Sequence, residues 1–448
     1  MIKIIIRIVV CSIITQFVLL TVQSPSFALD VRRTVLENGL TLLTVERHNL
    51  PVVKVAVGLN AGSLMEPEEK AGLANITASL LTEGTQTRTS REISESIEFV
   101  GGSIGAGGGD DYSTVSLSIL KKDIELGFDL LSDIMLRPSF PEDELNKKKE
   151  RIIAGLKAQE EDPGFVASKE FKKAVFGTHP YGRLVSGTEE TLEPISRADI
   201  INFHSSYYVP NGAIMAVVGD ISPAEVTSLL QRYFSDWHPR DVEKNGLPPL
   251  SEERQRRIVT VDKDLTQATI KLGHQGVSRN SPDYYAVSVM NYILGGGGFA
   301  SRLMLNIREE KGLVYDIHSF FAADKYGGSF QVGLQTKNES ANVSIKEVLE
   351  EIKKIKSEPV SDAELSDAQS FLTGSFPMRI ETSSRIAGFL VAVEYYDLGV
   401  DYIDNYPMYI NSISKEDIMR VAKKYLDDSE FTLVVVADQE KAAVREKW

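Results

Sequence analysis

The chain has 448 residues and a formal net charge of −14 at pH 7. This acidity argues against nucleic acid as a partner, because binding to a phosphate backbone requires clustered Lys and Arg side chains. The one cysteine, Cys11, lies in an N-terminal apolar run, so we do not expect disulfide bonds to stabilise the fold. The length is sufficient for two domains of ordinary size, each with its own core.

Residues 1–28 are typical of a secretory signal peptide. Lys3 and Arg7 precede an apolar segment, and Ser26-Phe-Ala28 is a small-x-small cleavage site. We therefore expect a mature chain that begins at Leu29, is periplasmic or secreted, and has no stable membrane association. The alternative is an uncleaved N-terminal anchor, because the apolar segment is rich in Ile and Leu.

Residues 29–244 are predicted to form an α+β unit with strands first, then helices, then a final strand. Apolar residues alternate or run together in two predicted strands, 52–59 and 112–120. They recur at helical spacing in three predicted helices, 72–84, 124–135 and 145–156. Capping-box patterns predict four helix starts, at Thr89–Glu92, Ser139–Glu142, Ser222–Glu225 and Ser361–Glu364. The glycine-rich stretch 101–109 is expected to be a flexible loop.

The chain contains an internal repeat of about 220 residues. In the first half, Ser196-Arg-Ala-Asp-Ile200 precedes a Tyr and an apolar strand that ends at Asp220. In the second half, Ser414-Lys-Glu-Asp-Ile418 precedes the same features, which end at Asp438. A repeat of this length indicates two homologous domains rather than a solenoid. We predict their bounds as 29–244 and 245–448, each a largely antiparallel sheet with helices packed on one face.

Two further stretches carry a resemblance to a known family. In the first half, Leu59-Asn-Ala-Gly-Ser-Leu-Met-Glu-Pro67 precedes a helix that begins near Gly72. In the second half, Leu294-Gly-Gly-Gly-Gly-Phe-Ala-Ser-Arg-Leu303 leads into Asn306-Ile-Arg-Glu-Glu-Lys-Gly-Leu-Val-Tyr315. Both resemble the pitrilysin (insulinase-like, M16) zinc peptidases, and the similarity covers essentially the whole mature chain. It implies the two-domain fold of that family and peptide substrates.

The zinc motif of that family is absent. Its members carry His-x-x-Glu-His on the helix after the first stretch, where two His bind zinc and the Glu activates a water. The corresponding positions are Asn75, Ala78 and Ser79, and the third ligand position falls at Ala154 or Gly155. None of these side chains supplies an imidazole or a carboxylate, so we expect no metal in this chain.

The resemblance also implies roles for residues of the second half. Arg308 and Tyr315 match a pair that, in active relatives, faces the zinc across the substrate chamber and holds the substrate and its developing oxyanion. Gly295, Gly296 and Gly297 are expected to form a tight turn that lets chain or substrate approach closely. The alternative is structural: an ion pair with Glu309 or Glu310 for the arginine, and packing on Phe320 or Phe321 for the tyrosine.

Loss of the zinc motif together with retention of the Arg/Tyr pair resembles the noncatalytic chain of two-chain members of the family. We therefore expect a noncatalytic subunit of a periplasmic zinc endopeptidase, inactive alone, that supplies Arg308 and Tyr315 to a zinc-bearing homologue. A heterodimer is favoured over a homodimer, and zinc is expected in the partner. Two alternatives stay open: a peptide-binding scaffold without a part in proteolysis, and an enzyme with relocated zinc ligands.

Overall fold

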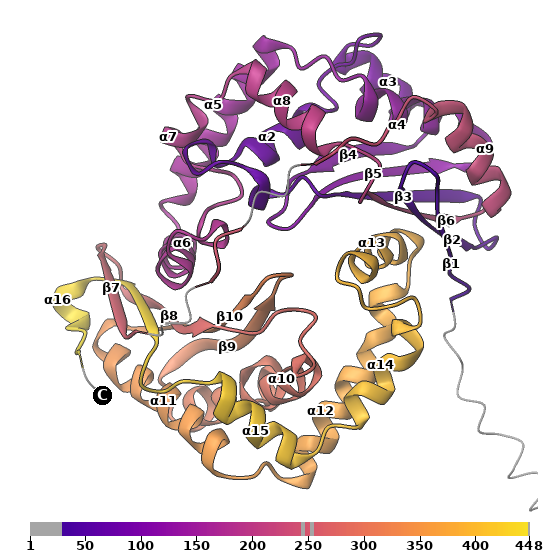
Figure 1. The fold of residues 1–448 in the computed structure, drawn as a ribbon. Helices are drawn as coiled ribbons and strands as arrows, with labels where there is room; N and C mark the ends of the chain where they lie inside the picture. Colours follow the sequence, from indigo (N-terminus) through magenta and orange to yellow (C-terminus); the bar gives the residue numbers. More distant parts are fainter. Residues whose placement is uncertain (1–28, 243–246, 251–254, 447–448) are drawn as a thin grey trace, which may run out of the picture.

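The computed structural model describes residues 29–242, 247–250 and 255–446. The predicted signal peptide, 1–28, and the predicted domain boundary near residue 245 lie outside the described residues. Two sheets, one from each half of the chain, organise the molecule, and helices surround both (Figure 1). Within the described ranges, no helix is long and apolar enough to cross a membrane.

The first sheet has six strands in the order β1-β2-β6-β3-β5-β4. Their bounds are β1 Arg32–Val35, β2 Thr41–Glu46, β3 Val52–Leu59, β4 Ser103–Gly107, β5 Ser113–Leu120 and β6 Ile214–Gly219. The first-half helices are α2 Leu73–Leu80, α3 Ser90–Phe99, α4 Ile124–Leu136, α5 Glu142–Gln159, α6 Pro163–Phe176, α7 Glu189–Leu192, α8 Arg197–Tyr207 and α9 Pro223–Tyr233. Strand β5 alternates buried apolar residues with exposed hydroxyls, so its buried face packs on the helices and its other face is polar.

The second sheet has five strands in the order β7-β11-β8-β10-β9. Their bounds are β7 Arg257–Asp262, β8 Gln267–Gln275, β9 Val314–Ala323, β10 Gly328–Lys337 and β11 Thr432–Ala437. The helices are α10 Tyr284–Asn291, α11 Ala341–Ser357, α12 Asp362–Ser375, α13 Ser383–Tyr395, α14 Tyr402–Asn411, α15 Lys415–Tyr425 and α16 Gln439–Ala442, with two π-helical segments, η5 Tyr292–Gly296 and η7 Met304–Glu310.

The two sheets share one topology, which bears out the internal repeat. In the first, β6 lies between a parallel neighbour, β2, and an antiparallel neighbour, β3. In the second, β11 lies between parallel β7 and antiparallel β8. The helix before each of these strands starts with a capping box within the repeated stretch, at Ser196 for α8 and at Ser414 for α15. The edge strands β4 and β9 therefore occupy equivalent positions.

Each half also contributes one helix that packs on the sheet of the other half. Helix α6 packs on β8 and β11, and α13 packs on β3 and β6. In Figure 1 the two helices lie on opposite sides of the space between the sheets. The prediction of helices on one face of each sheet is therefore incomplete. On the face that each sheet turns toward the other sheet, here called the inner face, α13 covers β3 and β6, and α6 covers β8 and β11. The inner faces of β4/β5 and β9/β10 are more open. Local sequence patterns could not predict this exchange, because it joins residues far apart in the chain.

A buried carboxylate fastens the two halves together. Asp111, on the connection between β4 and β5, accepts hydrogen bonds from the hydroxyls of Tyr181 (2.5 Å) and Tyr396 (2.9 Å) and from the backbone N–H of Lys325 (3.1 Å). The hydroxyl of Tyr395 donates to the backbone carbonyl oxygen of Asp111. Burial, followed by the nearby Asp111 charge, raises the pKa of all three phenols, so they stay protonated as donors.

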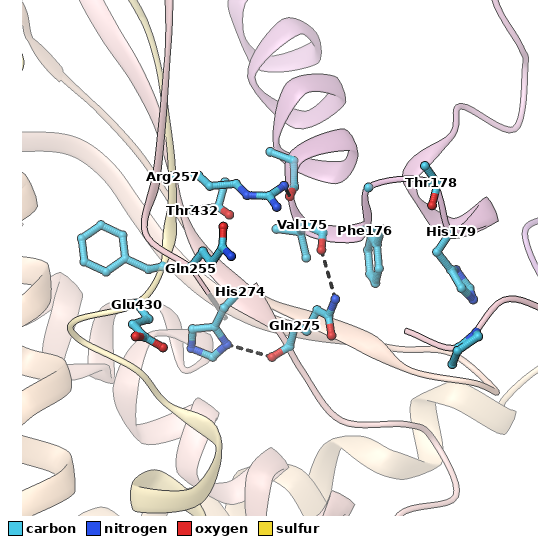
Figure 2. Close-up of a pocket in the computed structure, with 14 residues that line it drawn as sticks. Val175, Phe176, Thr178, His179, Gln255, Arg257, His274, Gln275, Glu430 and Thr432 are labelled. Atoms are coloured by element: carbon cyan, nitrogen blue, oxygen red, sulfur yellow. Dashed lines mark hydrogen bonds between the residues drawn. The ribbon is translucent and has the colours of Figure 1, made fainter. Parts of the chain in front are cut away.

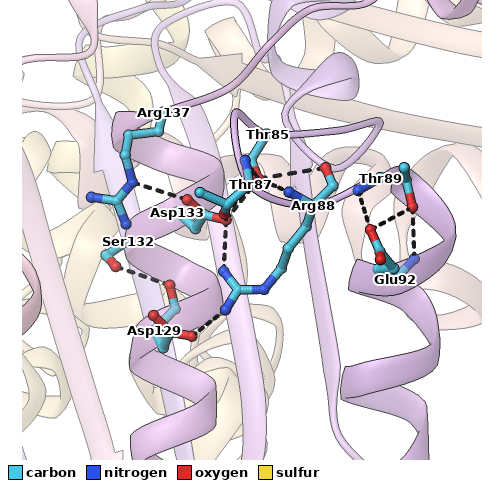
Figure 3. A network of polar contacts seen from close by, with 9 residues as sticks. All are labelled: Thr85, Thr87, Arg88, Thr89, Glu92, Asp129, Ser132, Asp133 and Arg137. Carbon is cyan, nitrogen blue, oxygen red and sulfur yellow. Dashed lines mark hydrogen bonds and ion pairs between the residues drawn. The ribbon is translucent and has the colours of Figure 1, made fainter.

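A second buried carboxylate, Asp133 on α4, fixes the loop that follows α2 (Figure 3). It accepts hydrogen bonds from the hydroxyls of Thr85 and Thr87 and from the guanidinium groups of Arg88 and Arg137, at 2.7 to 3.0 Å. Burial opposes ionisation of the carboxyl, but these donors outweigh it and lower the pKa of Asp133. The loop is therefore held as part of the frame around α2.

Two local predictions are wrong. Ser139 does not cap a helix: α5 begins at Glu142 after Pro141, because the Ser139 backbone N–H donates to Gly84 and its carbonyl accepts from Arg197. The glycine-rich stretch 101–109 is not simply a flexible loop, since Ser103–Gly107 forms strand β4 and pairs with β5 in regular antiparallel register. Pairing with a neighbouring strand outweighs the weak strand preference of glycine. The other three capping boxes form as predicted.

Candidate functional site

The three positions of the lost zinc motif lie on α2, against the sheet. Ala78 is fully buried, and the Ser79 hydroxyl donates to the Ile76 carbonyl at 3.0 Å. Asn75 is covered by the glycine stretch: a Cβ on Gly108 would lie only 2.6 Å from the Asn75 Cα. The chain after β4 thus lies in close contact with α2 at these positions, which carry no metal ligand.

A glutamate outside the motif stabilises the start of α2. The Glu66 carboxylate accepts the backbone N–H groups of Gly72 (2.9 Å) and Ala74 (2.8 Å), which lack helical partners. Burial raises the pKa of Glu66 to about 7, although these two hydrogen bonds oppose the shift. Glu66 is therefore a capping residue, and both of its oxygens are occupied by backbone donors.

The positions expected for a third zinc ligand carry no ligand either. Ala154 and Gly155 are exposed on α5, and a Cβ built on Gly155 would meet no atom within 4 Å. Across the described ranges, no group of three or more His, Cys, Asp or Glu side chains is placed to hold a metal ion. These residues do not fit a catalytic zinc, so no step is assigned to a metal held by this chain.

In the second half, the structure brings Arg308 and Tyr315 together at the start of the edge strand β9. Arg308 lies in the last turn of η7, and its Nε donates to the Tyr315 carbonyl at 2.9 Å across a turn at Gly312, which has a φ of +61°. The Tyr315 side chain is 77% exposed, so it does not pack into the core. The Arg308 guanidinium also pairs with Glu309, as the structural alternative expected, and lies 5.1 Å from the ring centroid of the exposed Phe299.

Two buried contacts hold the segment that carries Arg308. Arg302 binds Glu364 of α12 through two hydrogen bonds of 2.6 and 3.1 Å, and Asn306 donates to the buried Glu351 of α11 at 2.7 Å. Although burial opposes it, bonding to Arg302 and to the Ser361 cap lowers the pKa of Glu364 to about 2. The guanidinium of Arg308 is thus displayed from a fixed segment.

The expected tight turn at Gly295, Gly296 and Gly297 serves close packing of the chain. A Cβ on Gly295 would lie 2.5 Å from the Ser319 hydroxyl of β9, and one on Gly297 would lie 2.7 Å from the Tyr292 carbonyl. The glycines therefore let η5 lie directly against β9. Gly295 is buried, whereas Gly296 is exposed.

The pocket shown in Figure 2 is separate from these residues and has a volume of 180 Å³. It lies where the C-terminal end of α6 meets the second sheet. Arg257 donates to the Ala174 carbonyl at 2.9 Å, and Gln275 donates to the Val175 carbonyl at 3.1 Å. Its polar groups thus satisfy the last carbonyls of α6 and attach that helix to the other half.

Sequence reasoning missed three residues of the inner sheet face: Lys271 on β8, Gln331 on β10 and His318 on β9. They come together only through strand pairing, since Lys271 is paired with Gly333 and Gly333 with His318. No motif spaced along the chain could have revealed them. The signal available in the sequence was a lysine, Lys271, directly between the apolar residues Ile270 and Leu272.

Comparisons with known proteins agree with this architecture. The family "Insulinase (Peptidase family M16)" matches residues 41–189, and "Peptidase M16 inactive domain" matches residues 194–372. An uncharacterized zinc protease of Bacillus subtilis is 26% identical over 361 residues, which cover 79% of this chain and 85% of the relative. An uncharacterized zinc protease of Rickettsia bellii is 27% identical over 389 residues, covering 86% and 90%.

Solved structures show the same fold. A crystal structure of a peptidase M16 inactive domain from Pseudomonas fluorescens has a TM-score of 0.85 at 29% identity and covers 91% of this chain and 98% of that one. The structure of a protease from Helicobacter pylori has a TM-score of 0.84 at 22% identity, covering 91% and 100%, and supports the fold alone. Shared topology, both family matches and these relatives agree: the chain belongs to the M16 peptidase family.

Proposed function

We propose that this chain is the noncatalytic subunit of a periplasmic M16-type zinc endopeptidase. It pairs with a zinc-bearing homologue, the partner holds the metal and its activated water, and this chain supplies Arg308 and Tyr315 to the shared site for peptide hydrolysis. The observation that carries the proposal is an asymmetry: α2 offers no metal ligand, whereas a half-buried guanidinium bonded to the backbone of a residue with an exposed phenol lies at the start of the edge strand β9.

The chemistry assigned to Arg308 and Tyr315 is electrostatic. Hydrolysis of a peptide bond develops negative charge on the carbonyl oxygen, and fixed donors aimed at that oxygen stabilise the transition state more than the substrate. A guanidinium supplies a permanent charge, and a phenol supplies one neutral donor. The supports at Arg302 and Asn306 favour this role, since donors that are already positioned need no reorganisation.

The test is peptidase activity of the complex reconstituted with its zinc-bearing partner. Arg308→Ala and Tyr315→Phe are each expected to lower kcat/KM by about 10²- to 10³-fold, the loss typical of removing one oxyanion donor. Arg91→Ala, on the exposed surface of α3, and Tyr326→Phe, on the turn after β9, are matched controls that should keep full activity. Full activity of both Arg308 and Tyr315 variants would refute the proposal.

A peptide-binding scaffold without proteolysis is the second candidate. The observation in its favour is that β4 and β9 both end their sheets, so each offers main-chain groups to an extended peptide. A complex that binds peptides but never cleaves them would support this candidate over the first.

A further inference from the structure

The open inner face of the second sheet carries a row of side chains outside the Arg308 site. Helix α6 marks this face, because it packs on Val434 and Val436 of β11. Strand pairing places Val434 beside Lys271, Lys271 beside Gly333, and Gly333 beside His318. The row therefore runs from the part that α6 covers to the open edge at β9.

Lys271 is half-buried and has no carboxylate partner among the described residues. Its ammonium group donates to Gln331 Oε1 at 3.4 Å and lies 5.8 Å from the ring centroid of Phe320. Burial lowers the pKa of Lys271, and no nearby carboxylate counters the shift. A charge withdrawn from water without a counter-charge is unfavourable for folding, so its position calls for an anion from outside the chain.

The Lys271 ammonium and the His318 ring meet over a glycine, Gly333. A Cβ on Gly333 would lie 3.2 Å from Lys271 Nζ and 3.1 Å from His318 Nε2, so the two side chains converge over a residue that has none. His318 is held in place by Asp316, 3.1 Å from its Nδ1, and by stacking on Phe320. The Lys271 ammonium, the Gln331 amide and the Phe320 ring therefore lie close together on this face.

We propose that Lys271 and Gln331 form a binding subsite for a carboxylate of a peptide lying along β9, with the His318–Phe320 stack as its wall. The ammonium has two donors beyond the one used on Gln331, and the Gln331 amide nitrogen adds a neutral donor. The carboxylate is either an acidic side chain or the C-terminus of the peptide. This subsite rests on the proposed function, in that a peptide is the molecule brought to this face.

The experiment measures binding of three short fluorescent peptides to the mature chain alone. The first has a central glutamate and an amidated C-terminus, the second has glutamine there and a free C-terminus, and the third has glutamine and an amide, so it carries no carboxylate. We expect at least one carboxylate peptide to bind about tenfold more tightly than the neutral one, the size of one charge-assisted hydrogen bond. Which one does so identifies the source of the carboxylate.

Variants of the subsite sharpen the test. Lys271→Met should abolish the preference, and Lys271→Arg should restore most of it. Gly333→Ala keeps every charge, but its methyl group would press on Lys271 Nζ and His318 Nε2 and displace them, so it should reduce the preference. Lys54→Met is the matched control, since Lys54 lies on the equivalent inner face of the first sheet and already donates to Ser118. Thermal melts of each variant verify that it is folded.

Any of three results would refute the proposed subsite. These are equal affinity for all three peptides, no binding of either carboxylate peptide at millimolar concentration, and an unchanged preference for a carboxylate peptide in folded Lys271→Met. The assay contains no partner and reads no cleavage. Failure of the proposed function would instead appear as a complex that does not hydrolyse peptides, with the carboxylate preference of this chain intact.

Discussion

The two edge strands, β4 and β9, occupy the same place in their sheets but present different chemistry. The inner face of β4 and its neighbour β5 consists of glycines and small hydroxyl side chains, and the helix behind them, α2, carries no ligand at the zinc-motif positions. Strand β9 presents Tyr315 and His318, with Arg308 beside its first residues. Both halves thus have the same fold, while the side chains to which we assign a function lie at one edge.

The contrast shows that the hydrogen-bonded scaffold of a half can persist without reactive side chains at its edge strand. The first half still holds α2 with Glu66, its following loop with Asp133, and its edge strand in regular register, although none of these supports a metal. Buried hydrogen-bonded carboxylates of this kind are costly to disturb, so they persist for stability. The second half has similar supports, at Arg302 and Asn306, for the segment that carries Arg308.

The largest effect on stability is expected at the junction that fixes the two halves. Asp111→Asn removes the charge that accepts two phenol hydrogen bonds and one backbone hydrogen bond. We expect the free energy of unfolding to fall by about 3 kcal/mol, as for other disrupted buried networks. Denaturant unfolding of the mature chain measures this. Asp110→Asn, at a more exposed residue paired with Lys172, should cost under about 1 kcal/mol; equal losses would show that Asp111 does not fasten the halves.

A smaller, pH-dependent effect is expected from Glu66. Its pKa is raised to about 7 in the folded chain, above the ordinary value of 4.5, so the stability it contributes is full below about pH 4.5 and is lost as pH rises through 7. Asp324 behaves alike: burial, then Asp111 and Asp110, raise its pKa to about 7. The loss is at most about 3 kcal/mol for Glu66 and about 4 kcal/mol for Asp324, whose ordinary pKa is 3.8.

Unfolding measured from pH 4.5 to 8 checks this prediction. Glu66→Gln and Asp324→Asn should each flatten the slope, and the double variant should flatten it most. A slope unchanged in the double variant would mean that neither carboxyl titrates in this range. The Glu66 result also bears on the comparison of the two halves, because it tests whether Glu66 stabilises α2, a helix of the first half that carries no metal ligand.

The smallest effect is expected at the lost zinc motif itself. Asn75→Ala and Ser79→Ala remove no described ion pair, so unfolding free energy should change by roughly 0.5 kcal/mol or less and activity of the complex should not change. The same assay detects the large loss expected for Arg308→Ala. A strong activity loss at Asn75 would show that the first edge retains chemistry and would break the comparison.

Much of the frame was predictable because its signals are local. The spacing around Ser196 and Ser414 predicted two equivalent units, and the boxes at Thr89, Ser222 and Ser361 predicted helix starts that the structure has. Each signal depends on residues within one or two helical turns. The proximity of Arg308 and Tyr315 followed from a short spacing across one turn.

The remaining features depend on pairing between distant segments. Nothing near Ser103 indicates that β5 would hold a glycine-rich stretch as a strand, and nothing near Asp111 indicates the tyrosines that surround it. The arrangement of side chains around Lys271 requires the registers of three strands at once. Such features depend on tertiary structure, which overrides local preference.

The most direct test of the central claim compares the mature chain purified alone with the chain recovered together with its natural partners, each assayed for peptide cleavage with and without a zinc chelator. The account predicts chelator-sensitive cleavage in the co-purified sample and none by the lone chain. Chelator-sensitive cleavage by the lone chain would contradict it, because the metal site would then lie in this chain. Absence of cleavage in both samples would contradict the subunit role and favour a peptide-binding scaffold.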